Sequence, residues 1–305
     1  MKSFLTSLSA YTFLLLIASV AGAQSTPTDA ERLAQFQAAV DRPVVLTVPG
    51  MDRVNVRRDI IYKTDGSTSL ALDVYTPPDL PAGSTRPAVI FIHGGLPAAL
   101  AFMKPKDWGI YKSYGRLIAA SGLAGVTFNY RMGYPDPDLK QAARDVTDLI
   151  NYVREHGAEL GIDKDRICLA AYSAGGPMLS LGMGDSMPYV KSLVAMYAIL
   201  DVRYSPLYRK CCDADELRRF SPAAYLESRA GKLPPIFVGR AGQDQAPGLL
   251  EGMNGFVARA IVTNAPIEFL NDPAASHAFD NQPADPGAKA VVRAELAFMK
   301  EFLTE

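Results

Sequence analysis

The sequence is poor in cysteine, in histidine and in net charge. Its 305 residues include three cysteines and three histidines, and the formal net charge is −1. Nearly balanced charge gives no overall field that would attract nucleic acid or an anionic membrane. An odd number of cysteines cannot all pair within one chain, and these three show no metal-ligand spacing. We expect Cys168 to be a buried thiol, whereas Cys211 and Cys212 could be two thiols or a strained vicinal disulfide.

Apolar runs long enough to cross a bilayer are also lacking. The run Tyr11–Val20 has ten residues, whereas a spanning helix needs roughly 20. It follows Lys2 and precedes Ala21-Gly22-Ala23, which is the pattern of an export signal cleaved after Ala23. We expect residues 1–23 to be a signal peptide and the protein to be secreted or periplasmic, without stable membrane insertion. An uncleaved anchor is the alternative.

The remaining sequence has the composition of a soluble globular protein. Hydrophobic residues make up 49% and charged residues 21% of the chain, which is long enough for one large α/β domain. Leu33, Phe36 and Val40 recur at helical spacing. We therefore expect a peripheral segment over 24–50 with a short amphipathic helix, followed by one domain over 51–305.

Strand and helix patterns alternate along this domain. Alternating apolar residues predict an antiparallel hairpin over 53–75, with its turn at Asp65-Gly66. Apolar runs predict further strands at 88–92, 124–129, 167–172, 190–199, 235–238 and 267–270. Helical spacing predicts helices at 111–120, 138–155 (ended by Gly157), from 173, 247–262 and 288–302. Residues 201–232 form an irregular, charge-mixed insertion. This order indicates a mostly parallel sheet with antiparallel N-terminal edge strands and helices on both faces.

The strongest functional signal is Ser173, which follows a buried strand and precedes a helix. Small residues flank it in Ala171-Tyr172-Ser173-Ala174-Gly175. A strained turn of this kind exposes a serine hydroxyl above the sheet as a nucleophile. Such a serine needs a base, an acid that orients the base, and donors for a tetrahedral oxyanion.

Three histidines compete for the role of the base. His277 follows the last predicted strand, at the edge where open α/β sheets bind ligands. His156 ends a helix, and His93 ends the strand at 88–92. Position favours His277, with an ordinary loop hydrogen bond as the alternative role.

Asp244 is the favoured acid because it follows a strand and lies between Ser173 and His277 in the sequence. Asp272 and Asp280 compete by proximity to His277, but we expect both to cap turns. For the oxyanion, Gly94 and Gly95 offer backbone N–H groups on a loop, and Ala174 offers one at a helix start. A merely flexible turn at Gly94-Gly95 is the alternative.

The combination resembles the α/β-hydrolases, most closely bacterial esterases and lipases of the hormone-sensitive-lipase-like and dienelactone-hydrolase-like branches. The resemblance covers 53–303 and is carried by the motifs at 93–95, 129–131, 161–167 and 171–175 and by the loops of Asp244 and His277. Ala171 departs from the usual first glycine of the elbow, and Leu96 from a third glycine of the lipase-like loop. Ser173 also departs from dienelactone hydrolases that use a cysteine. The subfamily stays open.

The resemblance implies a serine hydrolase that cleaves carboxylic esters without a cofactor or metal. It implies that Ser173 is the nucleophile, that His277 is the base and that Asp244 is the acid that orients it. The oxyanion donors that it implies are the N–H groups of Gly94, Gly95 and Ala174. The partner would be a small-molecule ester, with loop 96–109 and insertion 201–232 walling its pocket. A serine peptidase or amidase on the same fold and a catalytically silent binding protein are the alternatives.

Overall fold

The computed structural model describes residues 28–95, 103–132 and 137–304. The expected signal peptide and the loop residues 96–102 lie outside these ranges. No helix within them is both long enough and apolar enough to cross a membrane.

The fold is built on one eight-stranded sheet with the order β1-β2-β4-β3-β5-β6-β7-β8. Its strands are β1 (Asn55–Asp65), β2 (Thr68–Thr76), β3 (Arg86–Ile92), β4 (Ala124–Phe128), β5 (Ile162–Tyr172), β6 (Val190–Met196), β7 (Ile236–Ala241) and β8 (Ile267–Asp272). Strands β1 and β2 pair antiparallel, β2 joins β4 antiparallel, and all the other pairs are parallel. The predicted parallel sheet with an antiparallel N-terminal edge is confirmed.

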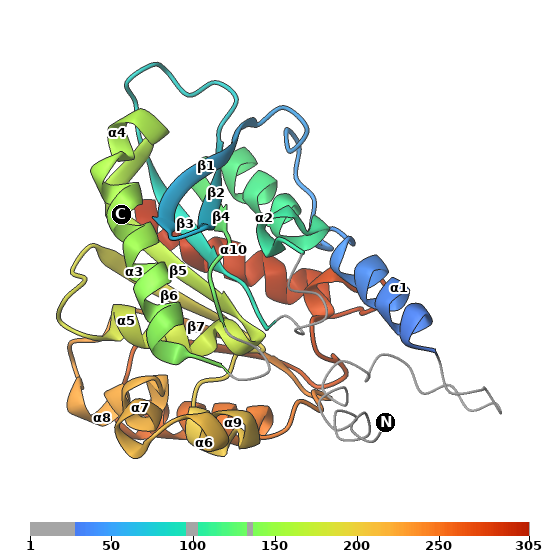
Figure 1. The fold of residues 1–305 in the computed structure, drawn as a ribbon, viewed down its shortest axis with the longest axis vertical. Helices are drawn as coiled ribbons and strands as arrows, with labels where there is room; N and C mark the ends of the chain where they lie inside the picture. The colour runs from blue at the N-terminus through green and yellow to red at the C-terminus, as the bar shows by residue number, and fades with distance from the viewer. Residues whose placement is uncertain (1–27, 96–102, 133–136, 305) are drawn as a thin grey trace.

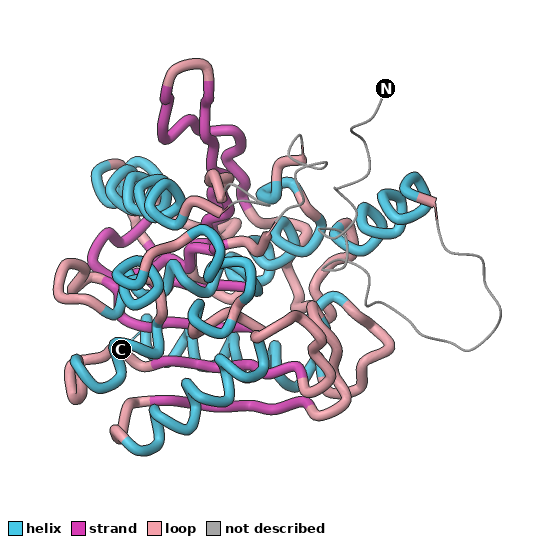
Figure 2. The backbone as a smooth tube through the Cα atoms, turned by 60° about the horizontal axis from the view of Figure 1, so that its bottom comes forward, coloured by secondary structure: helices cyan, strands magenta, loops and turns pink. Residues whose placement is uncertain are grey.

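Helices cover both faces of the sheet (Figures 1 and 2). They are α1 (Asp29–Val40), α2 (Gly109–Ala120), α3 (Leu139–Glu155), α4 (Gly157–Leu160), α5 (Ser180–Met183), α6 (Pro206–Cys211), α7 (Ala214–Arg219), α8 (Tyr225–Ser228), α9 (Leu249–Val262) and α10 (Ala288–Thr304). Helices α1, α2 and α10 pack on one apolar cluster, and α3, α5 and α9 pack on the other. Each face of the sheet therefore has its own large apolar core.

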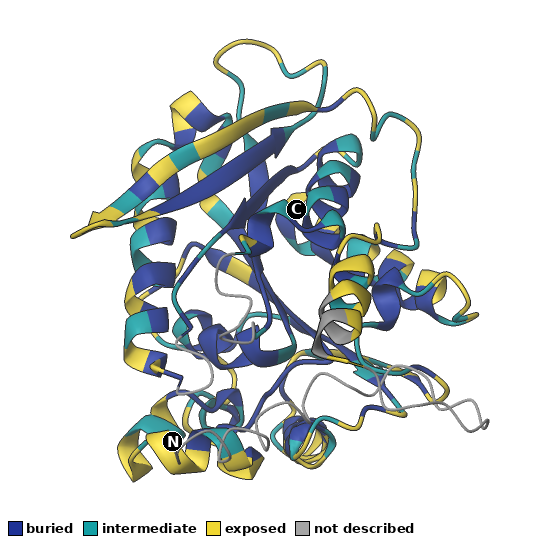
Figure 3. Cartoon of the chain, turned by 45° about the vertical axis from the view of Figure 1, so that its right-hand side comes forward, coloured by how far each residue is buried: buried dark blue, intermediate teal, exposed yellow. Residues whose placement is uncertain are grey.

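Burial explains why the central strands appear in the sequence as continuous apolar runs. Every residue of β4 is buried, as is all of β3 after Arg86, because helices cover both faces there. The edge strand β1 is mostly exposed, in contrast to β2 beside it (Figure 3). The central strands therefore form the buried frame of the sheet.

The structure corrects three local predictions. The hairpin turn lies at Gly66-Ser67, one residue later than expected, with Gly66 at φ +59°. Gly157 does not end the helical region, since α3 stops at Glu155 and Gly157 begins the short α4. The insertion 201–232 is not irregular but contains α6, α7 and α8, which were missed because each is shorter than two turns.

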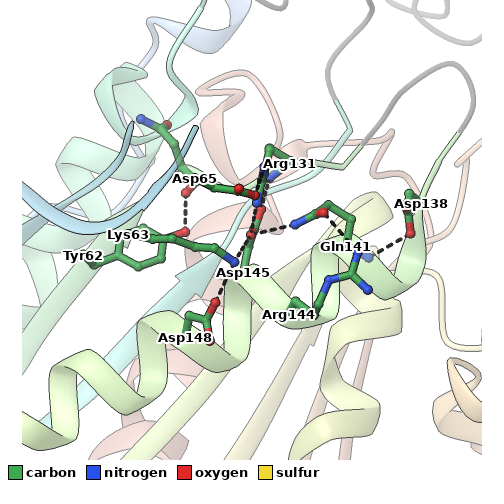
Figure 4. A network of polar contacts seen from close by, with 10 residues as sticks. Tyr62, Lys63, Asp65, Arg131, Asp138, Gln141, Arg144, Asp145 and Asp148 are labelled. Atoms are coloured by element: carbon green, nitrogen blue, oxygen red, sulfur yellow. Dashed lines mark hydrogen bonds and ion pairs between the residues drawn. The ribbon is translucent and has the colours of Figure 1, made fainter. Parts of the chain in front are cut away.

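A buried carboxylate ties the hairpin to α3 (Figure 4). Asp145 is fully buried, and it accepts hydrogen bonds from Lys63 of β1 (2.7 Å) and from Arg131 after β4 (2.8–3.0 Å). Burial alone would raise the pKa of Asp145, but the hydrogen bonds from Arg131 and Lys63 outweigh it and lower that pKa. The ionised side chain therefore stabilises the junction between the hairpin and α3.

Replacing Asp145 by alanine should lower the free energy of unfolding by about 3 kcal/mol, because two partly buried cations lose their shared partner. Urea unfolding followed by circular dichroism measures the loss. The matched control is Asp148→Ala, which removes a half-exposed carboxylate that also contacts Lys63 (2.6 Å) and should cost under ~1 kcal/mol. Equal losses in the two variants would contradict this account of the junction.

Candidate active site

Ser173 stands at the carboxyl end of β5 with a left-handed backbone, φ +53°. Non-glycine residues rarely adopt this conformation, and it marks stored strain at functional positions. The chain then enters a 3₁₀ helix over Ser173–Leu179 rather than the α-helix that we expected there, with Pro177 inside it. The local geometry is that of the predicted strand-to-helix elbow.

Two glycines make this turn possible. A Cβ added to Gly175 would lie 2.6 Å from the carbonyl oxygen of Ile92, and one added to Gly176 would lie 2.3 Å from that of Ile199. Such contacts are far inside van der Waals distance, so neither position has room for a side chain. Ala171, which departs from the usual elbow, is fully buried in β5, where its methyl group is accommodated.

The structure brings Ser173, His277 and Asp244 together from three loops at one edge of the sheet. His277 follows β8 and Asp244 follows β7. The Oγ atom of Ser173 lies 2.9 Å from Nε2 of His277, and Nδ1 of His277 lies 2.6 Å from Oδ2 of Asp244. Because the carboxylate of Asp244 accepts, the N–H at Nδ1 of His277 donates this hydrogen bond, which leaves Nε2 to accept a hydrogen bond from the serine hydroxyl. These distances match an activated nucleophile with an oriented base.

Asp244 is well prepared to orient the imidazole. Its side chain is fully buried, and its other oxygen, Oδ1, accepts the backbone N–H of Ala246 at 2.9 Å. The carboxylate is therefore fixed in place by its own loop. The imidazole of His277 remains about one third exposed, so that a substrate can reach it.

The other two histidines have structural surroundings. His93 is buried, its ring lies tilted against that of Tyr130 with centroids 4.2 Å apart, and its Nδ1 lies 2.8 Å from the carbonyl oxygen of Gly94. Burial lowers the pKa of His93 to about 4, so the ring stays neutral. His156 stacks on Tyr152 beside Glu159. In the ranges that the structure describes, neither ring hydrogen bonds with Ser173.

The expected oxyanion donors differ in whether their N–H groups already have an acceptor within the chain. The N–H of Gly94 donates to the hydroxyl of Tyr111 at 3.1 Å, so Gly94 is a poor candidate for a donor and this expectation is corrected. Gly94 instead lets its loop approach the elbow, since an added Cβ would lie 3.0 Å from Cβ of Ser173. For the N–H groups of Gly95 and Ala174, no acceptor occurs among the described residues. These two amides remain the candidate pair.

The insertion packs on the elbow through α6. The hydroxyl of the buried Tyr208 lies 3.4 Å from the carbonyl oxygen of Ala174, and Phe220 and Leu226 of the insertion are buried in the same apolar cluster as Tyr208. On the other side of the site, Trp108 stacks on Tyr111 and contacts Phe36, so Trp108 serves packing. The part of the expected pocket wall at 96–102, with Phe102, lies outside the described residues.

The cysteines are all free thiols. Cys168 is buried in β5, as expected, and burial raises its pKa to about 12. Cys211 and Cys212 end and follow α6 with their sulfur atoms 3.2 Å apart. Among the described residues, no group of three or more His, Cys, Asp or Glu side chains is arranged to hold a metal ion.

Asp280 differs from its expected role, and Glu295 was not singled out by the sequence. Asp272 caps a turn as predicted, since its Oδ1 accepts the N–H of Ala274 at 3.1 Å. Asp280, in contrast, is fully buried and accepts hydrogen bonds from tyrosine hydroxyls, and Glu295 of α10 lies in the same cluster. The only available sequence signal was the presence of tyrosines in otherwise apolar strands and helices.

Comparison with known proteins finds a matching family model and similar proteins. The family model described as BD-FAE matches residues 72–189, a range that includes the serine elbow. "Probable isoprenylcysteine alpha-carbonyl methylesterase ICMEL1" of Arabidopsis thaliana is 27% identical over 216 residues, covering 60% of this chain and 43% of that protein. Carboxylesterase 3 of Homo sapiens is 33% identical over 177 residues, covering 52% of this chain and 29% of that protein. The chain thus spans less than half the length of either relative.

Solved structures of an esterase from Thermogutta terrifontis share the architecture. The native Est2 structure has a TM-score of 0.65 at 20% identity, covering 84% of this chain and 95% of that one. Esterase 2 phosphorylated by paraoxon has a TM-score of 0.63 at 22% identity, covering 85% and 96%. Together with the sheet order and the elbow, these similarities show that the chain has the α/β-hydrolase fold.

Proposed function

We propose that this protein is a serine hydrolase that cleaves carboxylic esters through an acyl-enzyme on Ser173. The observation that carries the proposal is the continuous hydrogen-bond chain from Ser173 through His277 to Asp244 at a strained elbow. The similarity to proteins named as esterases supports the ester as the bond that is cleaved.

In the acylation step, His277 takes the hydroxyl proton as Oγ of Ser173 forms a bond to the ester carbonyl carbon. The N–H groups of Gly95 and Ala174 donate to the resulting oxyanion. When the tetrahedral intermediate collapses, the carbon–oxygen bond to the alcohol breaks and Nε2 of His277 returns the proton to the leaving alkoxide. The products of this half-reaction are the free alcohol and an ester on Ser173.

Deacylation repeats the sequence with water as the nucleophile. His277 takes a proton from water, the hydroxyl oxygen attacks the acyl carbon, and Ser173 leaves with the proton that Nε2 returns. Asp244 holds the imidazole in the tautomer that both half-reactions need. The cycle uses only groups of this chain and one water molecule.

Export is a second part of the proposal. It is supported by the positive residue, the short apolar run and the small residues before Gln24 in the sequence. Expression of the full-length chain in a bacterial host, followed by N-terminal sequencing of the protein found outside the cytoplasm, should give a mature protein beginning at Gln24. Full-length protein retained in the membrane would instead support an uncleaved anchor.

A panel of chromogenic esters tests the activity directly. The chain lacking residues 1–23 is assayed with p-nitrophenyl esters of increasing acyl length and with the p-nitroanilide of the best acyl group. We expect ester turnover at least about 10²-fold faster than anilide turnover, because an aryl oxide leaves far more readily than an anilide nitrogen, which must be protonated before it can leave. Faster anilide cleavage would identify an amidase or peptidase, and no turnover would favour a silent binding protein.

A further inference from the structure

Two carboxyl groups are buried together beneath the candidate active site. Asp280 and Glu295 are 0% and 1% exposed. Tyr114 of α2 places its hydroxyl between them, 3.0 Å from Oδ2 of Asp280 and 3.1 Å from Oε2 of Glu295. Tyr172 donates to Oε1 of Glu295 at 2.8 Å, and Tyr197 donates to Oδ1 of Asp280 at 2.8 Å. We call these five side chains the acid–tyrosine cluster.

The contacts in this cluster require one more proton than the tyrosines supply. There are four oxygen–oxygen contacts at hydrogen-bond distance and three phenolic hydrogens. Each such contact needs one hydrogen, and a phenol has only one to give. Tyr114 can direct its hydrogen at one carboxyl group only, and a proton on the other carboxyl group, donated to the Tyr114 oxygen, gives every contact its own hydrogen. One carboxylate and one carboxylic acid together satisfy all four contacts.

Both carboxyl groups are buried, and their surroundings favour Glu295 as the protonated one, because Asp280 is the carboxyl group that faces the imidazole of His277. Burial raises the pKa of Glu295 to about 8 and that of Asp280 to about 6, so Glu295 is the acid and Asp280 the carboxylate near neutral pH. The titratable groups facing the pair from the surrounding elements are Tyr111 and Tyr114 of α2, Cys168 and Tyr172 of β5, Tyr197 after β6, and His277 after β8. Among these partners only the imidazole can carry a positive charge, and it favours an ionised Asp280.

The cluster is joined to both ends of the Ser173–His277 contact. Tyr172 directly precedes Ser173, and its hydroxyl is held by Glu295. Tyr197 packs edge-on against the imidazole of His277, with ring centroids 5.0 Å apart. Its backbone has φ +37°, a conformation that a tyrosine keeps only when its surroundings hold it there. The hydrogen bond to Asp280 is one of the contacts that fix this residue.

We propose that Asp280 and Glu295 share one proton through Tyr114 and thereby act as positioning residues for Ser173 and His277. Asp280 fixes Tyr197 against the imidazole, and Glu295 fixes Tyr172 at the base of the elbow. The proton sharing is independent of the reaction, whereas the positioning role rests on the proposed function.

The proton count is tested through stability, without any substrate. The folded-state pKa of Glu295 is about 8 against an ordinary value of 4.5, so between these pH values the folded state holds a proton that the unfolded state lacks. Raising the pH therefore lowers the stability of the wild type. In Glu295→Gln the amide oxygen can still accept from Tyr172 and the NH₂ group can still donate to Tyr114. The amide does not lose this donor as the pH rises. We expect Tm of the wild type to fall relative to Tm of Glu295→Gln between pH 6 and pH 8.

The matched control is Glu301→Gln, which makes the same change at an exposed position of α10. Its Tm should follow the wild type across the same pH range. Parallel Tm curves for the wild type and Glu295→Gln would overturn the shared proton.

The positioning role is tested by comparing two amide substitutions. Glu295→Gln mimics the protonated carboxyl group and should lower kcat by no more than about threefold. Asp280→Asn instead places an amide N–H donor against the hydroxyl donors of the tyrosines. This second variant should lower kcat by roughly tenfold or more, with little change in KM. Should Asp280→Asn fail to fold, Tyr197→Phe removes only the hydroxyl that Asp280 holds and should also reduce kcat selectively.

Equal effects of the two amide substitutions, or a larger effect of Glu295→Gln, would overturn the assignment of the proton and its role. If Asp280→Asn or Tyr197→Phe changed KM and left kcat unchanged, the positioning role of the cluster would be overturned. If the wild type hydrolyses no ester, the proposed function fails, yet the Tm comparison still decides whether the carboxyl groups share a proton.

Discussion

Replacing Ser173 by alanine should lower kcat for ester hydrolysis by about 10⁴–10⁶-fold. The substitution removes the atom that forms the acyl-enzyme, and His277 is left with no hydroxyl to deprotonate. Residual turnover would come from oxyanion stabilisation and binding alone. The measurement is steady-state hydrolysis of the best p-nitrophenyl ester, with Tm recorded for each protein.

The fold should survive this change, because alanine differs from serine only by the hydroxyl group. Ser180→Ala is the matched control: this serine lies just beyond the same 3₁₀ helix, where its hydroxyl donates to the carbonyl oxygen of Pro177 at 2.6 Å. We expect its kcat to stay within about twofold of the wild type. Wild-type turnover in a folded Ser173→Ala protein would refute the assignment of the nucleophile.

Replacing Asp244 by asparagine should lower kcat by about 10³–10⁴-fold. An asparagine that turns its NH₂ group toward His277 stabilises the tautomer with the proton on Nε2, and that nitrogen can no longer accept from Ser173. Because the chain positions Asp244 through the N–H of Ala246, the geometry should persist while the tautomer changes. Steady-state kinetics at neutral pH measure the loss.

Asp272→Asn is the control for this second prediction, since it makes the same chemical change in the neighbouring loop. An asparagine there keeps an oxygen that can cap the N–H of Ala274, so kcat should stay within about threefold. If the two variants lost activity equally, the effect would come from the loops in general and not from the contact between Asp244 and His277.

The Ser173–His277–Asp244 site was accessible from the sequence because its signals are local. Ser173, Asp244 and His277 each follow a predicted strand that pairs in parallel within the sheet, and the carboxyl ends of parallel strands meet at one edge. Three histidines left few alternatives for the base. The structure then supplied the distances that join the three residues.

The acid–tyrosine cluster was not accessible in the same way. Tyr114 meets Asp280 and Glu295 across 166 and 181 residues of sequence, and nothing local marks such a contact. For the same reason Gly94 appeared free to bind an oxyanion, whereas its N–H is taken by Tyr111 from a different element. Short helices such as α7 were missed because they present too little periodicity, although Asp213 and Glu216 form a capping box at its start.

Labelling with an organophosphate ester tests the central claim most directly. The purified chain is incubated with diethyl p-nitrophenyl phosphate, digested and analysed by mass spectrometry. An activated serine displaces p-nitrophenol and retains the diethylphosphoryl group. We predict one such group, on the peptide that contains Ser173, and none in the Ser173→Ala variant. A folded wild-type protein that acquires no label, or acquires it at another residue, would contradict the account.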